Sequence, residues 1–195
     1  FKQPATFVRR SNIRGVNGRI NFLGEEILPL DEKAVLDAAY ELVNSAGCQA
    51  IAINFLHSYA NTKHEEIAVN LLKENYPKLA ISAGGLLANE YREYERTSTT
   101  VLDSYIKPVL KNYLQHLKLG MQEKGFDGKY YVMNSAGGAL TFEMAAAKPI
   151  STIFSGPAGG VSGALDLAKI MKKKNLLSID VGGTSLDANL ILDFE

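Results

Sequence analysis

The octapeptide DVGGTSLD, residues 180–187, separates two segments that have the patterns of β-strands. Residues 176–179 form a short apolar run that is typical of a buried strand. From Leu186 to Phe194 an apolar side chain stands at every second position, which is the periodicity of a strand with one covered face. A double glycine between two strands predicts a tight hairpin, because glycine accepts φ > 0 without a steric penalty.

The hairpin turn also has the composition of an anion site. Successive N–H groups at Gly182, Gly183 and Thr184 can form a concave surface that binds an anion. Asp180 and Asp187 flank the turn, and a carboxylate repels a phosphate unless a cation lies between them. The sequence therefore predicts that Mg²⁺ and a nucleotide bind here together. The alternative is a plain hairpin whose glycines serve the turn and whose acids face solvent.

The length of the loop decides how the two carboxylates lie. A two-residue loop, Gly182-Gly183, would place Asp180 opposite Ser185 and Asp187 diagonal to Asp180 on the same face of the sheet. A three-residue loop would place the carboxylates on opposite faces. Both loop lengths stay open, and the magnesium interpretation is weaker for the three-residue loop. We expect the apolar face of Leu186, Leu190 and Leu192 to pack against the rest of the chain or another copy.

The composition is that of an ordinary globular chain: 195 residues, 46% hydrophobic and 22% charged, with a formal net charge of zero. A neutral chain gives no electrostatic basis for nucleic-acid binding, and no stretch is long and apolar enough to span a membrane. The single cysteine, Cys48, excludes an internal disulfide and suits a reducing, cytoplasmic compartment. Because the chain starts at Phe1 and stops just after a strand-like run, we expect it to be a piece of a longer protein.

The rest of the chain alternates helical and strand patterns. Residues 1–30 are expected to form short strands, with a turn at Asn17-Gly18. The later elements follow in order: a helix capped by Asp31 and ending at Ser45, a strand over 49–56, a helix capped by Asn61 and ending before Pro77, a strand over 79–83, a helix over 97–124 kinked or split at Pro108, a strand over 129–133, and helices over 142–147 and 158–172. This alternation predicts a largely parallel sheet with helices packed on it.

The final helix is unusually rich in small residues. Ser155 could cap it, and Gly156, Gly160 and Gly163 fall on one of its faces. Each glycine inside a helix costs about 1 kcal/mol, so several together indicate that something approaches this face closely. The approach could be a hinge contact between domains or ordinary close packing within one core.

Two further segments are rich in polar residues, and the sequence does not establish a function for either. Asn134, Ser135, Gly137 and Gly138 follow a predicted strand, where a loop could line a ligand crevice or could be a plain turn into the next helix. The charged and hydroxyl residues of 90–100 are expected to be a helix cap with solvated ion pairs. The histidines provide no third ligand at a spacing that would support a zinc site.

Taken together, the motifs carry a resemblance to a known family. The chain resembles the hydantoinase A/oxoprolinase family, within the superfamily of actin, heat-shock chaperones and sugar kinases. The matching stretches lie in the family's order at 24–32, 55–59, 64–65, 93–99, 134–138, 155–160 and 180–187.

The resemblance implies an α/β fold with a ribonuclease-H-like mixed sheet and flanking helices. Residues 1–30 would be strands of the family's N-terminal region, residues 31–175 most of a first lobe, and residues 176–195 the opening hairpin of a second lobe. The family's first phosphate hairpin, adenosine loop and second connecting helix have no counterpart in these 195 residues. The chain alone would therefore bind ATP weakly and turn nothing over.

The resemblance also implies an activity for the intact protein: ATP-dependent hydrolysis of a cyclic amide, such as a hydantoin or 5-oxoproline, after phosphorylation of its carbonyl. Gly182, Gly183, Thr184 and Ser185 would cradle phosphates, while Asp180 and Asp187 would hold Mg²⁺ through water. Two alternatives stay open, a subunit of an ATP-dependent ketone carboxylase and a non-enzymatic ATP-driven switch. A hydantoinase-B-like subunit or a homo-oligomer would be the partner.

Overall fold

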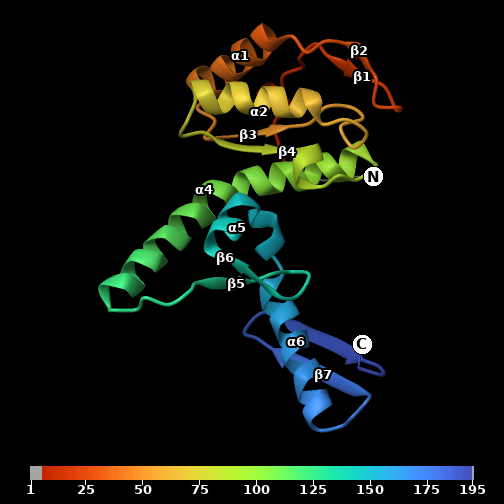
Figure 1. Cartoon of the computed structure of the whole chain (residues 1–195), viewed down its shortest axis with the longest axis vertical. Coiled ribbons are helices and arrows are strands. Elements are labelled where there is room, and N and C mark those ends of the chain that lie inside the picture. The colour runs from red at the N-terminus through yellow and green to blue at the C-terminus, as the bar shows by residue number, and fades with distance from the viewer. Residues whose placement is uncertain (1–5, 195) are drawn as a thin grey trace. The chain divides into compact units, whose positions relative to one another are not determined.

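A computed structural model describes residues 6–194 (Figure 1). The chain divides into two compact units, Phe1–Asn112 and Tyr113–Glu195. Both units combine helices with small sheets, which confirms a mixed α/β fold. No helix among the described residues has the length and apolar character needed to cross a membrane.

The first unit is built around one parallel strand pair. Its elements are η1 (Arg10–Asn12), β1 (Arg19–Ile20), β2 (Glu26–Leu28), α1 (Glu32–Tyr40), the π-helical turn η2 (Glu41–Ser45), β3 (Ala50–Ile53), α2 (Lys63–Asn75), β4 (Ala80–Ala83), α3 (Gly84–Leu87) and the first part of α4 (Glu93–Glu123).

The core of this unit lies where α1 and α2 pack on β3 and β4. Its buried apolar side chains are Val35, Ala39, Ile51, Ile53, Ala68, Val69, Leu72 and Ala83. In Figure 1 the start of α4 runs along the opposite side of β4 from α2, and Ser82 on β4 donates a 2.6 Å hydrogen bond to Asp103 on α4. Asp31 caps α1 as predicted, since its carboxylate accepts from the N–H of Ala34 at 2.9 Å.

The turn between β1 and β2 lies at a later position in the chain than the sequence predicts. β1 and β2 are antiparallel, and their turn is made by residues 21–25, where the Asn21 side chain accepts from the N–H groups of Leu23 and Glu25. The prediction of a turn at Asn17-Gly18 is therefore wrong. Gly18 serves close packing instead, because a Cβ there would lie 3.1 Å from both the His64 ring and Leu30.

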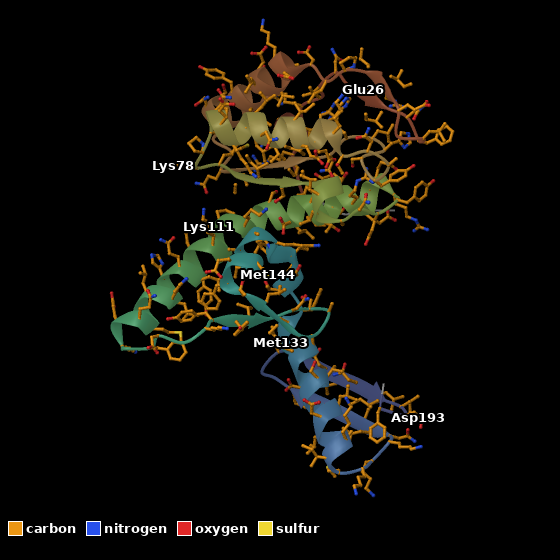
Figure 2. All side chains as sticks on the ribbon, in the orientation of Figure 1. Glu26, Lys78, Lys111, Met133, Met144 and Asp193 are labelled. Atoms are coloured by element: carbon orange, nitrogen blue, oxygen red, sulfur yellow. The ribbon has the colours of Figure 1, made fainter. Side chains whose placement is uncertain are left out.

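A charged contact joins β2 to α2. Figure 2 labels Glu26, whose carboxylate lies 2.7 Å from Lys63 Nζ and 2.8 Å from the buried His64 Nε2. The hydrogen bonds from Lys63 and then His64 hold the pKa of the Glu26 carboxyl below its usual value. Because folding favours the ionised form, this contact stabilises the fold above the carboxyl's ordinary pKa and loses that effect as pH falls through the lowered value.

We therefore expect Glu26→Gln to destabilise the chain at pH 7 and to do so progressively less as the medium is acidified below the usual glutamate pKa of about 4.3. Urea unfolding at a series of pH values measures this difference between variant and wild type. The exposed Glu74→Gln is the control and should show no such pH dependence. A Glu26→Gln difference that is constant with pH would contradict the assignment.

The second unit consists of two antiparallel hairpins and the helices beside them. Its elements after α4 are β5 (Tyr131–Met133), β6 (Ala139–Thr141), α5 (Phe142–Ala147), η3 (Pro149–Thr152), α6 (Ser155–Ile170), β7 (Leu176–Val181) and β8 (Leu186–Ile191). Met133, labelled in Figure 2, packs its side chain 3.3 Å from the Cβ position of Gly159 on α6.

Two sequence expectations fail on these elements, and one alternative of a third is excluded. Among the described residues only β3–β4 is parallel, because β5–β6 and β7–β8 are joined by loops too short for a parallel crossover. The long helix begins at Glu93 and continues through Pro108 without a split, so of the two expected outcomes only a kink at Pro108 stays a prediction. Ser155 is the first residue of α6 and makes no cap, and Phe154 occupies the capping position.

Candidate functional site

The β7–β8 hairpin brings the two predicted carboxylates face to face. Asp180 pairs directly with Asp187 across the strands, and Val181 pairs with Leu186 as the last step of the ladder. The loop therefore has four residues, Gly182–Ser185, and is closed by a 2.9 Å hydrogen bond from the Gly182 N–H to the Ser185 carbonyl. This is neither of the two loop lengths that the sequence left open. Its even number of residues still places both carboxylates on one face, as a two-residue loop would, and they are directly opposite each other and not diagonal.

A directly opposed pair of aspartates is unfavourable for the apo hairpin. Side chains that face each other across an antiparallel pair lie about 4.5–5.5 Å apart at Cβ, and like charges there are destabilising. The neighbouring residues supply no compensating cation, since the ion pairs of the described residues involve neither Asp180 nor Asp187. A divalent cation between the two carboxylates would remove this repulsion.

The glycines of the loop are not explained by the turn itself. Neither Gly182 nor Gly183 lies at positive φ, so the expectation that the turn needs that conformation is wrong. A Cβ on Gly183 would meet nothing within 4 Å, and one on Gly182 would only reach an ordinary contact at 3.6 Å from the Ser185 carbonyl. What the glycines do provide is an uncovered backbone that a ligand can approach closely.

The donor set fits magnesium together with a phosphate better than a metal alone. Within residues 6–194 no group of three or more His, Cys, Asp or Glu side chains is arranged to hold a metal ion. Mg²⁺ is commonly held by one or two carboxylates while substrate phosphates and water complete its octahedron. Asp180 and Asp187 match that pattern.

The hairpin exposes its apolar face and covers its polar one. The face that carries Asp180 and Asp187 also carries Ile191, which is 2% exposed, and α6 contacts both strands. On the other face Leu186, Leu190 and Leu192 are 61%, 64% and 52% exposed. Among residues 6–194 nothing covers this face as expected, because the side chains that α6 buries belong to the opposite face.

We expect the chain to self-associate through this bare face, since a contiguous apolar sheet surface is unfavourable in water. Sedimentation of the wild-type chain should show a concentration-dependent dimer, which Leu190→Lys converts to monomer. Leu119→Lys, at an exposed leucine on α4, should leave the dimer intact. A wild-type chain that stays monomeric at every concentration would contradict this.

The Asn134–Gly138 segment is a complete turn. It joins antiparallel β5 to β6, so it does not lie at the end of a parallel strand. Gly137 and Gly138 lie at φ +87° and +75°, which only glycine adopts readily. Asn134 accepts from Ala136 N–H through its side chain, and Ser135 Oγ accepts from Phe154 N–H at 3.1 Å. The turn accounts for these residues, and a role in substrate binding stays a prediction.

The glycine face of α6 is open. A Cβ added at Gly156, Gly160 or Gly163 would meet nothing within 4 Å. Close packing within one core therefore does not explain these glycines among the described residues. A hinge contact stays a prediction.

Sequence reasoning missed a buried polar cluster at the carboxyl ends of β3 and β4. Glu65, fully buried, accepts from the N–H groups of Phe55 (3.0 Å) and Gly85 (2.6 Å), and so ties the two strand ends together. Arg96, 1% exposed, donates to the carbonyls of Glu90 (2.7 Å) and Phe55 (3.1 Å). Residues 90–100 are thus not wholly the solvated network that we expected.

A signal for this cluster was present in the sequence. Arg96, Thr100, Asp103 and Lys107 recur at spacings of three and four residues, so they share one face of α4. The structure turns that face toward the strands: the Thr100 hydroxyl donates to Asn54 Oδ1 at 3.1 Å, and Lys107 Nζ donates to the Ile81 carbonyl on β4 at 3.0 Å.

Comparison with known proteins covers nearly the whole chain. A family model described as "Hydantoinase/oxoprolinase" matches residues 96–195, and one described as "Hydantoinase/oxoprolinase N-terminal region" matches residues 2–76. An uncharacterized protein of Methanocaldococcus jannaschii is 35% identical over 99% of this chain and 28% of its own length.

Two solved structures are also similar. The ATP-dependent caprolactamase of Pseudomonas jessenii is 32% identical, with a TM-score of 0.82 over 91% of this chain and 26% of that one. The nucleotide-free structure of acetone carboxylase is 33% identical, with a TM-score of 0.78 over 93% of this chain and 26% of that one. The chain thus spans about a quarter of the length of these relatives.

Proposed function

Because the chain belongs to the hydantoinase/oxoprolinase family, we propose that it is part of an ATP-dependent enzyme that hydrolyses a cyclic amide. The similarity to an ATP-dependent caprolactamase, whose name describes the opening of a lactam, supports this reaction class. Within the enzyme, residues 1–30 would belong to the N-terminal region, residues 31–175 to a first ribonuclease-H-like lobe and residues 176–195 to the first hairpin of a second lobe.

The observation that carries the proposal is the β7–β8 loop, where glycines that the turn does not need lie beside two opposed carboxylates. Gly182, Gly183, Thr184 and Ser185 would receive the phosphates of ATP on their backbone and hydroxyl groups. Asp180 and Asp187 would hold Mg²⁺ through water. The bound cation would neutralise the charge that spreads over the transferring phosphoryl group.

The chemistry that such a site could perform is carbonyl activation. An amide carbonyl is a poor electrophile, and transfer of a phosphoryl group to its oxygen makes the adjacent carbon open to attack by water. Backbone N–H groups fixed by the loop would stabilise the charge of the transition state at little reorganisation cost. The isolated chain is expected to bind MgATP weakly and to show no turnover, because one hairpin provides only part of a phosphate cradle.

A second candidate is favoured by a specific observation. The acetone carboxylase structure is as similar in sequence as the caprolactamase structure, 33% against 32% identity. A ketone carboxylase would also activate a carbonyl with ATP, so the loop alone does not separate the two reactions. In either case a second subunit, of hydantoinase-B type for the hydrolase, is the expected partner.

The test is phosphate release by the full-length protein with MgATP. Three additions are compared: a cyclic amide (hydantoin, 5-oxoproline or caprolactam), a small ketone with bicarbonate, and buffer. Release stimulated by a cyclic amide, with ring-opened product, supports the hydrolase. Release stimulated only by ketone and bicarbonate supports the carboxylase. Release indifferent to all additions would overturn both and favour an ATP-driven switch.

A further inference from the structure

The second unit contains a cavity of mixed polarity, which we call the polar cavity. It lies beside the last turns of α4 and the segment 124–130 that leads from α4 to β5 (Figure 1). All the residues that line it belong to the second unit, and its volume is about 350 Å³. Pockets that bind small molecules span about 300–1,000 Å³, so this cavity has room for a small ligand. Its charged or hydrogen-bonding side chains include Lys118, Gln122, Asp127, Lys129, Thr141 and Glu143.

An apolar cavity adjoins the polar one. It has a volume of about 250 Å³ and shares Lys129, Tyr130 and Tyr131 with the polar cavity. The Tyr130 ring packs against the rings of Phe126 and Phe142, with 5.3 Å between centroids in each pair. The side chains that line only this second cavity are all apolar: Leu117, Met121, Phe126 and Phe142. The two cavities together thus offer one ligand a charged end and an aromatic end.

The segment between the two cavities is fixed by its own contacts. The Tyr130 hydroxyl donates a 3.1 Å hydrogen bond to the Phe126 carbonyl and so closes the segment on itself. The Phe126 ring packs onto Gly128, where an added Cβ would lie only 2.5 Å from the ring, so the contact requires a residue without a side chain. Asp127 and Lys129, on either side of this glycine, are therefore presented to the polar cavity by a defined turn of the chain.

Two of the four charged side chains of the polar cavity already pair with each other. Lys118 Nζ lies 3.1 Å from Glu143 Oε1, and it also stands 5.8 Å from the centroid of the Tyr130 ring. The ion pairs of residues 6–194 involve neither Asp127 nor Lys129. The cavity therefore keeps one carboxylate and one ammonium group, close together in the chain, that can each pair with a ligand.

We propose that these cavities bind a free α-amino acid with an apolar side chain, a ligand that the hydrolase function does not itself require. The ligand's carboxylate pairs with Lys129 and its ammonium group with Asp127, and both of its charges stand on one carbon as the chain's two charges stand on one short turn. Its apolar side chain occupies the aromatic cavity beside Phe126 and Phe142. A ligand with a single charge leaves either Asp127 or Lys129 unpaired and binds more weakly.

The test is calorimetric titration of the full-length protein, without nucleotide, with L-phenylalanine as the probe. Two analogues each lack one charge: 3-phenylpropanoate has no ammonium group and phenethylamine has no carboxylate. We expect each analogue to bind about 10-fold more weakly than phenylalanine. Lys129→Gln should weaken phenylalanine and 3-phenylpropanoate about 10-fold and leave phenethylamine unchanged. Asp127→Asn should weaken phenylalanine and phenethylamine and leave 3-phenylpropanoate unchanged.

The matched control is Lys124→Gln, because Lys124 is an exposed lysine of the same segment that lines neither cavity. It should bind phenylalanine as wild type does. The exchange of analogue preference between Lys129→Gln and Asp127→Asn supports the site. No heat of binding at millimolar phenylalanine, or binding that both variants leave unchanged, overturns it. Binding of 3-phenylpropanoate as tightly as phenylalanine overturns the amino-acid class. The titration needs no turnover, so its result is separate from that of the phosphate-release test.

Discussion

Asp180→Asn is expected to lower the substrate-dependent turnover of MgATP by the full-length protein about 10²-fold. The substitution keeps the shape of the side chain and removes its charge. It also removes the repulsion between the opposed residues Asp180 and Asp187, so the hairpin itself should be more stable without ligand. Loss of activity with gain of stability would mark a carboxylate that is held for a cation and not for the fold.

The measurement pairs steady-state phosphate release with thermal unfolding of the same variants. Asp187→Asn should behave as Asp180→Asn, and the double variant should be little worse than either single one, because the two carboxylates act on one cation. Asp193→Asn is the matched control, since this exposed aspartate follows β8 at φ +51°, which asparagine accepts. Full activity in Asp180→Asn would contradict the magnesium role.

Glu65→Ala is expected to destabilise the first unit by about 3–5 kcal/mol, the largest stability effect that we expect from a single side chain. Glu65 is fully buried, and its two oxygens accept from the N–H groups of Phe55 and Gly85. Removing the carboxylate leaves the buried Gly85 N–H and the part-buried Phe55 N–H without this partner, at up to about 1–3 kcal/mol each, and opens a cavity.

The control for this effect is the adjacent residue. Glu66 is exposed and accepts from the Thr62 hydroxyl, so Glu66→Ala should change the free energy of unfolding by less than about 0.5 kcal/mol. Urea unfolding of both variants at pH 7 gives the comparison. Equal, small effects at Glu65 and Glu66 would contradict the bridging role of the buried carboxylate.

The parts of the fold that were predicted correctly are those set by neighbouring residues. The cap at Asp31 and the strands at β3 and β4 follow from local patterns and appear in the structure. The failures arise where distant residues decide. Asn17-Gly18 is a typical turn sequence, but in the structure the small size of Gly18 allows His64 and Leu30 to pack closely against it. The length of the β7–β8 loop depends on which strand residues pair, which neither glycine specifies.

The candidate site likewise has features that follow from neighbouring residues and features that depend on residues distant in the sequence. The sequence indicated that Asp180 and Asp187 share a face only if the loop had two residues, and the observed four-residue loop gives the same result because it too has an even number of residues. The buried role of Glu65 and Arg96 depends on two strands and a helix that meet only after folding. Charged residues in a row were therefore interpreted as solvated, although their recurrence along one helix face indicated otherwise.

The Glu65 carboxylate couples the opening of two loops in the first unit. One carboxylate closes both the loop that follows β3 and the loop that follows β4, although the two are far apart in the sequence. Neither loop can open alone without leaving a buried charge partly unpaired, so the two should exchange between closed and open forms as a single cooperative unit. The edge of the sheet at the carboxyl ends of β3 and β4 would thus change conformation only when both loops open together.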